Sequence, residues 1–225
     1  MLDNKESTMA QNMDEQLNKL KKKLLEMAGL TEEAIYKSVK ALRNNDTQLA
    51  LRVIEEDKQI DRLELIIDEM AIDLIALQQP VARDLRLIIG VMKINAELER
   101  IADLSTNISH RVIELSEKPL LEPMVKITEL SQITCKMVKD AIDAFVHEDK
   151  KLAKDVILFD PKVNQLKNEL QHQLIYDYMV KDGTCAPQAV PLVLTVRHLE
   201  RISDHATNIA ENIIYILQSL CVRHQ

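Results

Sequence analysis

Apolar residues recur at three- and four-residue intervals along almost the whole chain, which is the spacing of one face of an α-helix. The first such stripe is formed by Leu17, Leu20, Leu24, Met27, Ala28, Ile35, Val39 and Leu42. Five polar or proline-containing stretches interrupt the pattern, at residues 44–47, 78–80, 117–123, 147–150 and 181–187. We therefore predict six helices. Pro80 and Pro187 are each expected in the first turn of a new helix, where the missing N–H is not needed.

The composition agrees with an all-α fold class. The chain of 225 residues has 3 glycines and 3% aromatic residues beside 46% hydrophobic and 29% charged residues. Sheets and tight turns depend on the residue types that are scarce here, whereas long amphipathic helices need the types that are abundant.

Two stretches of the chain are repeated, which indicates an internal duplication. Residues 144–160 match residues 41–57 at an offset of 103, and residues 199–209 match residues 98–108 at an offset of 101. The second match contains the hexapeptides "LERIAD" and "LERISD". We predict two pseudo-symmetric three-helix bundles, residues 1–117 with a polar N-terminal arm and residues 118–225.

Charge and hydropathy exclude several classes of function. The net charge of −7 gives no reason to expect nucleic-acid binding. No stretch of 18 or more uncharged apolar residues is present, and the first 23 residues are polar, so we expect no membrane insertion and a cytoplasmic location. The three cysteines share no CxxC spacing, which favours reduced thiols over a disulfide framework or a thiolate metal site.

The repeated hexapeptide places two carboxylates one helical turn apart on the same flank, Glu99 with Asp103 and Glu200 with Asp204. Like charges at this spacing destabilise an isolated helix by roughly 0.2 to 0.5 kcal/mol, so a cation is expected beside each pair. Arginines such as Arg100 could supply that charge through ion pairs.

A metal ion is the other candidate, because paired carboxylates suit hard cations such as magnesium, manganese or iron. Asp57 and Asp61 form a similar pair on the preceding helix, and the corresponding positions are Asp160 and Asn164. Asn107 and Asn208 are expected to extend the two acidic flanks, which should lie on the outer side of each bundle. His110 is the one histidine expected on such a flank.

An enzymatic function finds little support. A ferritin-like di-iron site needs two Glu-x-x-His motifs, and this chain has one, at Glu169 and His172, whose counterpart in the first half is Ile66. The chain also lacks an HExxH motif and a GxxxxGK[ST] phosphate-binding loop. We expect a non-enzymatic protein without an organic cofactor, and a metal-free interaction module stays open beside the metal-binding one.

At "QPVARDLRLIIGVMKINAELERIAD", "LERISD" and "DTQLALRVIEEDKQID" the sequence resembles the PhoU family, whose duplicated signature is written E(D)xxxD. The resemblance implies a frequently dimeric pair of three-helix bundles that acts as a negative regulator of phosphate uptake and phosphate-starvation signalling. It implies two partners, the ATPase subunit of the phosphate ABC transporter and a sensor histidine kinase.

Some members of that family carry metal at the signature motifs. Carried over to this chain, the resemblance implies metal ligands at Glu99, Asp103, Glu200, Asp204, Asp57, Asp61 and Asp160. The neutral Asn164 departs from the pattern. The second half should therefore bind metal more weakly unless Glu211 compensates.

Overall fold

The protein is described by a computed structural model that covers residues 2–118, 121 and 124–221, with side chains for residues 13–118, 121 and 126–218. Six long helices follow one another, and a π-helical segment η1 (Gln173–Met179) and a 3-10 turn η2 (Gly183–Cys185) precede the last helix. Their bounds are α1 (Leu2–Asn44), α2 (Thr47–Gln78), α3 (Ala82–Leu115), α4 (Met124–Val146), α5 (Lys150–His172) and α6 (Ala186–Cys221). The described residues contain no strand, so the all-α prediction and its six helices are confirmed.

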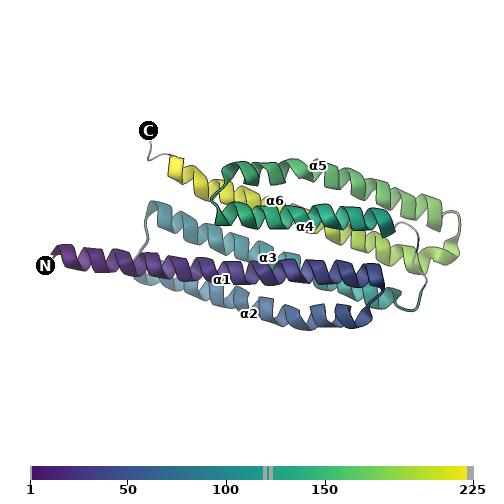
Figure 1. Cartoon of the computed structure of the whole chain (residues 1–225), viewed down its shortest axis with the longest axis horizontal. Coiled ribbons are helices and arrows are strands. Elements are labelled where there is room, and N and C mark those ends of the chain that lie inside the picture. The colour runs from purple at the N-terminus through teal and green to yellow at the C-terminus, as the bar shows by residue number, and fades with distance from the viewer. Residues whose placement is uncertain (1, 119–120, 122–123, 222–225) are drawn as a thin grey trace.

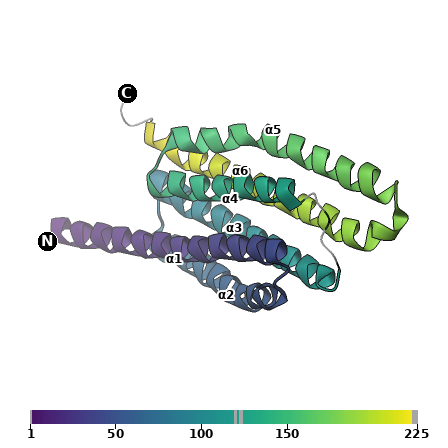
Figure 2. The same ribbon diagram turned by 45° about the vertical axis from the view of Figure 1, so that its right-hand side comes forward.

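The helices form two three-helix bundles that lie side by side (Figure 1). Helices α1, α2 and α3 pack on one another, as do α4, α5 and α6. The two bundles meet where α3 packs on α6 and α1 packs on α4, while α2 and α5 stay on opposite outer sides in both views (Figures 1 and 2). The predicted pseudo-symmetric pair of bundles is thereby confirmed.

The duplication is visible in the backbone of the first turn of each half. Asn45 and Glu148 have the same left-handed φ of 52°, 103 residues apart. The next residue in each case, Asp46 or Asp149, caps the following helix by accepting a hydrogen bond from the backbone N–H three residues later, at 2.9 and 3.0 Å. Such caps satisfy N–H groups that would otherwise have no partner at the helix start.

The second connection differs between the halves. In the first half Gln79 to Val81 join α2 to α3, and Pro80 precedes the helix, so its predicted place in the first turn is wrong. Val81 is the extended N-cap residue, so Pro80 lies one residue before the cap and outside the helix. Pro187 is the second residue of α6, as predicted. The π-helical segment in the second half follows from no pattern noted in the sequence.

Helices α3 and α6 approach closely at Gly90 of α3. A Cβ atom at this position would overlap the side chain of Ile216 on α6. Buried small residues line the same pair of helices, namely Ala102, Ser105, Ser109, Ser203, Ala206 and Ala210. Small side chains let these two helices approach closely, and Glu97, next to the first hexapeptide, contacts His205, next to the second.

In the described part of the chain, none of the helices combines the length and the apolar character that crossing a lipid bilayer requires.

Candidate functional site: two acidic flanks

The packing of α2 against α3 brings the predicted acids of the first half together. The negative charges of Asp61 and Asp103 both act on Asp57, and those of Asp103, Glu64 and Asp61 act on Glu99. We call these five residues, Asp57, Asp61, Glu64, Glu99 and Asp103, the first acidic flank. Glu64 is an addition that the sequence interpretation missed.

The first acidic flank is crowded enough to change the protonation of its members. Burial, followed by the charges of Asp61 and Asp103, raises the pKa of Asp57 from 3.8 to about 6. Burial also raises the pKa values of Glu99 and Glu64, and neighbouring carboxylates add to both effects. The Oδ1 atom of Asp57 is buried and accepts no hydrogen bond from the residues that the structure describes. Such an oxygen lacks the compensation that buried polar atoms normally have.

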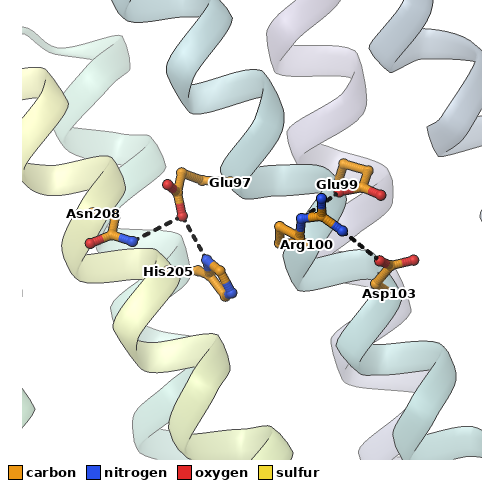
Figure 3. Close-up of polar contacts among 6 residues, drawn as sticks. All are labelled: Glu97, Glu99, Arg100, Asp103, His205 and Asn208. Carbon is orange, nitrogen blue, oxygen red and sulfur yellow. Dashed lines mark hydrogen bonds and ion pairs between the residues drawn. The ribbon is translucent and has the colours of Figure 1, made fainter.

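Arg100 supplies part of the positive charge that the sequence led us to expect. Its Nε lies 3.4 Å from Oε2 of Glu99, and its Nη1 lies 3.4 Å from Oδ2 of Asp103 (Figure 3). Both contacts are long, and 61% of the arginine side chain is exposed, so water weakens them. One exposed guanidinium group therefore leaves most of the negative charge of this flank uncompensated.

The packing of α5 against α6 builds the corresponding second acidic flank from Asp160, Glu200 and Asp204. Burial, then the charges of Glu200 and Asp160, raises the pKa of Asp204, while His205 and Lys167 oppose this effect. Asn164 donates a hydrogen bond to Oδ2 of Asp160 at 2.9 Å. Like that of Asp57, the Oδ1 atom of Asp160 is buried and has no hydrogen-bond partner within the described part of the chain.

The second acidic flank contains its own cation. The ammonium of Lys167 lies 3.1 Å from Oε1 of Glu200, and only 20% and 17% of these two side chains are exposed. The residue 103 positions before Lys167 is Glu64. Comparing the two halves at the same offset one helical turn beyond Asn164 shows this exchange of an acid for a base in the sequence.

The prediction that the acids lie on the outer side of each bundle is only half right. In each hexapeptide the first carboxylate is largely buried, with 20% of the Glu99 side chain exposed, whereas 44% of the Asp103 side chain is exposed. Asp57 and Asp160 likewise lie partly buried between helices. The reason is that neighbouring helices cover the side of the flank that adjoins the apolar stripe.

Asn208 does not extend the second acidic flank as expected. Its amide donates a hydrogen bond across the interface between the bundles to Oε2 of Glu97 at 3.1 Å, and Nδ1 of His205 lies 2.6 Å from the same oxygen (Figure 3). Burial alone would raise the pKa of Glu97, but these two hydrogen bonds, together with the charges of His205 and Arg100, outweigh it and lower the pKa. Asn107 and His110 are exposed on the first half.

The acids of each flank lie near one another, but their side chains do not converge on a single metal position. Among the residues that the structure describes, no three His, Cys, Asp or Glu side chains are grouped so that they could hold one ion. The donor set of the first acidic flank nevertheless suits a hard cation, because it consists of carboxylates and includes the unpartnered Oδ1 of Asp57. In the second flank the Lys167 ammonium already forms an ion pair with Glu200.

The sequence matches the model of one family, the PhoU domain, at residues 24–112 and again at residues 127–213. A relative from Aquifex aeolicus, called phosphate-specific transport system accessory protein PhoU homolog, is 41% identical over 93% of this chain and 95% of its own. The phosphate-specific transport system accessory protein PhoU of Escherichia coli K12 is 34% identical over 93% of this chain and 86% of its own.

Two solved structures have the same fold. The crystal structure of PhoU from Pseudomonas aeruginosa superposes with a TM-score of 0.89 at 36% identity, covering 91% of this chain and 98% of that one. The phosphate transport system regulatory protein PhoU from Streptococcus pneumoniae gives a TM-score of 0.84 at 27% identity, covering 91% and 96%.

Proposed function

The chain belongs to the PhoU family, and from this premise we propose that it is a negative regulator that couples a phosphate ABC transporter to a sensor histidine kinase. Its relatives are named accessory proteins of phosphate-specific transport, so its role lies in the regulation of phosphate transport. The observation that carries the proposal is the double domain match, one match in each bundle. Each bundle thus contains one copy of the domain.

A deletion strain tests the regulatory role. Removing the gene should leave phosphate-starvation genes expressed when phosphate is plentiful, because the repressing signal is lost. Expression is measured with a reporter in high and low phosphate, and the full-length gene on a plasmid serves as the control. Normal repression in the deletion strain would contradict the proposal.

The two partners are tested separately with purified proteins. The chain should bind the ATPase subunit of the transporter and the cytoplasmic part of the kinase, measured by interferometry with each partner immobilised. The ATPase subunit of an unrelated ABC transporter is the matched control. Equal binding to the related and unrelated ATPase subunits would remove the transporter from the proposal. A homodimer in solution is part of the same proposal and is checked by sedimentation.

We further propose that the acidic flanks bind hard cations, magnesium, manganese or iron, and that the first flank binds more tightly. Glu99, Asp103, Asp57 and Asp61 would hold the ion in the first half, with Glu64 nearby. In the second half Glu200, Asp204 and Asp160 would do so. The mutual repulsion within the first flank supports this order, because a divalent ion would relieve it. In the second flank Lys167 competes for Glu200.

Elemental analysis of protein purified without chelator tests whether metal is present. A titration of Mn²⁺ into chelator-treated protein then compares the wild type with Asp103→Ala and Asp204→Ala. Asp103→Ala should weaken the tighter binding, and Asp204→Ala should affect only the weaker phase. Identical binding by all three proteins, or none by the wild type, would leave a metal-free interaction module as the better account.

A further inference from the structure

Helices α1 and α4 lie side by side (Figure 1). Two adjoining cavities of about 250 and 450 Å³ lie between them and together form a groove. Tyr36 of α1 and Cys135 of α4 line both cavities and mark the middle of the groove. Because α1 and α4 belong to different bundles, anything bound here contacts both halves of the chain.

One end of the groove is positively charged. Lys40 and Arg43 line the smaller cavity, and no acidic side chain lines it with them. Neither cation forms an ion pair in the part of the chain described by the structure, whereas most of the lysines on α1 have a carboxylate partner. In a chain of net charge −7, two unpaired cations in one cavity make a local site for an anion. The planar arginine fork suits carboxylate or phosphate oxygens.

The middle of the groove offers a flat aromatic surface. The Tyr36 side chain is 62% exposed, and the Lys40 ammonium lies 5.9 Å from the centre of its ring. Val39 and Cys135 provide apolar walls beside it. An exposed ring next to apolar walls favours a second flat ring, which can stack on it.

The other end of the groove carries carboxylates. Glu32 and Asp140 line the larger cavity, together with Lys136 and Lys139. Asp140 is paired with Lys136, and Lys139 with Asp143, at 2.6 Å in the latter case. Glu32 is half-buried and feels the charge of Lys139, but no side chain of the described residues donates a hydrogen bond to it. This end can therefore accept hydrogen bonds from hydroxyl or amino groups.

From this order of charges we infer that the α1/α4 groove binds a small anion that carries a flat ring, of the class of nucleoside monophosphates. Its phosphate lies against Lys40 and Arg43, its ring stacks on Tyr36, and its hydroxyl or amino donors face Glu32. The site is separate from the acidic flanks and from the metal proposal. A ligand in this position ties α1 to α4 and so holds the two bundles together.

The test is calorimetric titration of the full chain with AMP, with adenosine and with inorganic phosphate. AMP should bind more tightly than either part. Arg43→Ala should weaken AMP binding by at least about tenfold, because it removes a charge-assisted hydrogen bond to the phosphate. Arg52→Ala, a matched exposed arginine on α2, should change the affinity by less than about twofold.

Tyr36→Leu tests the ring contact, and Tyr176→Leu is its control because Tyr176 is similarly exposed, at 54%, away from the groove. Tyr36→Leu should weaken AMP but leave inorganic phosphate unchanged. Circular dichroism confirms that each variant is folded. No AMP binding at millimolar concentration, equal affinity of AMP and inorganic phosphate, or equal loss in the variants and their controls would each overturn the inference.

Discussion

The two bundles have the same fold, but the charged residues beside their repeated hexapeptides differ. On the helix that faces the hexapeptide, the first half has four acidic residues, each about one helical turn after the last. At the four equivalent positions of the second half, one residue is acidic, one is a lysine and two are neutral amides. The pairs are Asp57 and Asp160, Asp61 and Asn164, Glu64 and Lys167, and Asp68 and Gln171. The second half thus neutralises part of this repulsion with an internal ammonium, whereas the first half would need the external cation that we propose.

The interface between the bundles shows a second difference of this kind. On one side Glu97 holds His205 and Asn208 of the other bundle. The residue 101 positions after Glu97 is His198, whose Nδ1 is buried and has no hydrogen-bond partner among the described residues. Equivalent positions of α3 and α6 therefore both face the interface between the bundles, but their polar contacts differ.

The largest expected effect comes from giving the second half the charge of the first. Lys167→Glu removes the ammonium 3.1 Å from Glu200 and adds a further carboxylate. The metal-free protein should lose roughly 2 to 3 kcal/mol in its free energy of unfolding, since breaking a fully buried pair costs about 3 to 5 kcal/mol and this pair is slightly exposed. Urea denaturation in the presence of chelator measures the change.

Lys162→Glu is the matched control, because Lys162 is an exposed lysine on the same helix. It should change the free energy of unfolding by no more than about 0.5 kcal/mol. Equal destabilisation by the two variants would mean that Lys167 does not neutralise the second acidic flank.

His198 should make the second half sensitive to acid. Burial, then the charges of Arg111, Arg201 and Arg197, lowers the pKa of His198 from 6.5 to about 4. Between these values the folded state binds fewer protons than the unfolded state, so stability falls as the pH drops from 6.5 to 4. After a discount for partial exposure the loss is roughly 1 to 2 kcal/mol.

His198→Gln should flatten the pH dependence of unfolding in this range, whereas the exposed His110→Gln should not. Urea denaturation at a series of pH values provides the measurement. An unchanged slope in His198→Gln would show that the buried imidazole is not kept neutral by its surroundings.

Asp57 should act in the opposite direction in the first half. Its folded pKa of about 6 lies above its ordinary value of 3.8, so the folded state binds more protons between these values. In metal-free protein its contribution to stability therefore falls as the pH rises from 4 to 6. After a discount for exposure, Asp57→Asn should stabilise the metal-free protein at pH 7 by roughly 1 kcal/mol. Thermal unfolding in chelator checks this, and destabilisation by Asp57→Asn would contradict it.

Arg100 should matter least. Its two contacts are 3.4 Å long and its side chain is 61% exposed, so Arg100→Ala should destabilise the metal-free protein by no more than about 0.5 kcal/mol. The measurement is the midpoint of urea denaturation. A loss comparable with that of Lys167→Glu would mean that the first half, like the second, carries its own neutralising cation.

The fold could be predicted from the sequence because its signals are local and repeated. Asp46 and Asp149 follow the ends of apolar stripes and cap the next helices, and the offset of 103 residues assigns them to equivalent turns. Pro80 was misplaced because a proline near a helix start fits both the first turn and the link before it. The π-helical segment Gln173–Met179 lies in the connection between α5 and α6. The geometry of that connection cannot be predicted from the apolar periodicity of a single helix.

The candidate site could be predicted only in part. The spacing of Glu99 and Asp103 shows that both acids share one flank, but their different exposure depends on the neighbouring helix. Asn208 has the same place in its repeat as Asn107, yet it bonds Glu97 of the other bundle. Such contacts follow from how the two bundles pack, and a repeat within one chain does not specify that packing.

The most direct test of the charge difference is a Mn²⁺ titration, followed by electron paramagnetic resonance, of the wild type and the two exchange variants Glu64→Lys and Lys167→Glu. Glu64→Lys should weaken the tighter binding by at least about tenfold, because it places a cation among the acids of the first flank. Lys167→Glu should strengthen the weaker binding by a similar factor. The same titration curve for all three proteins would contradict the account.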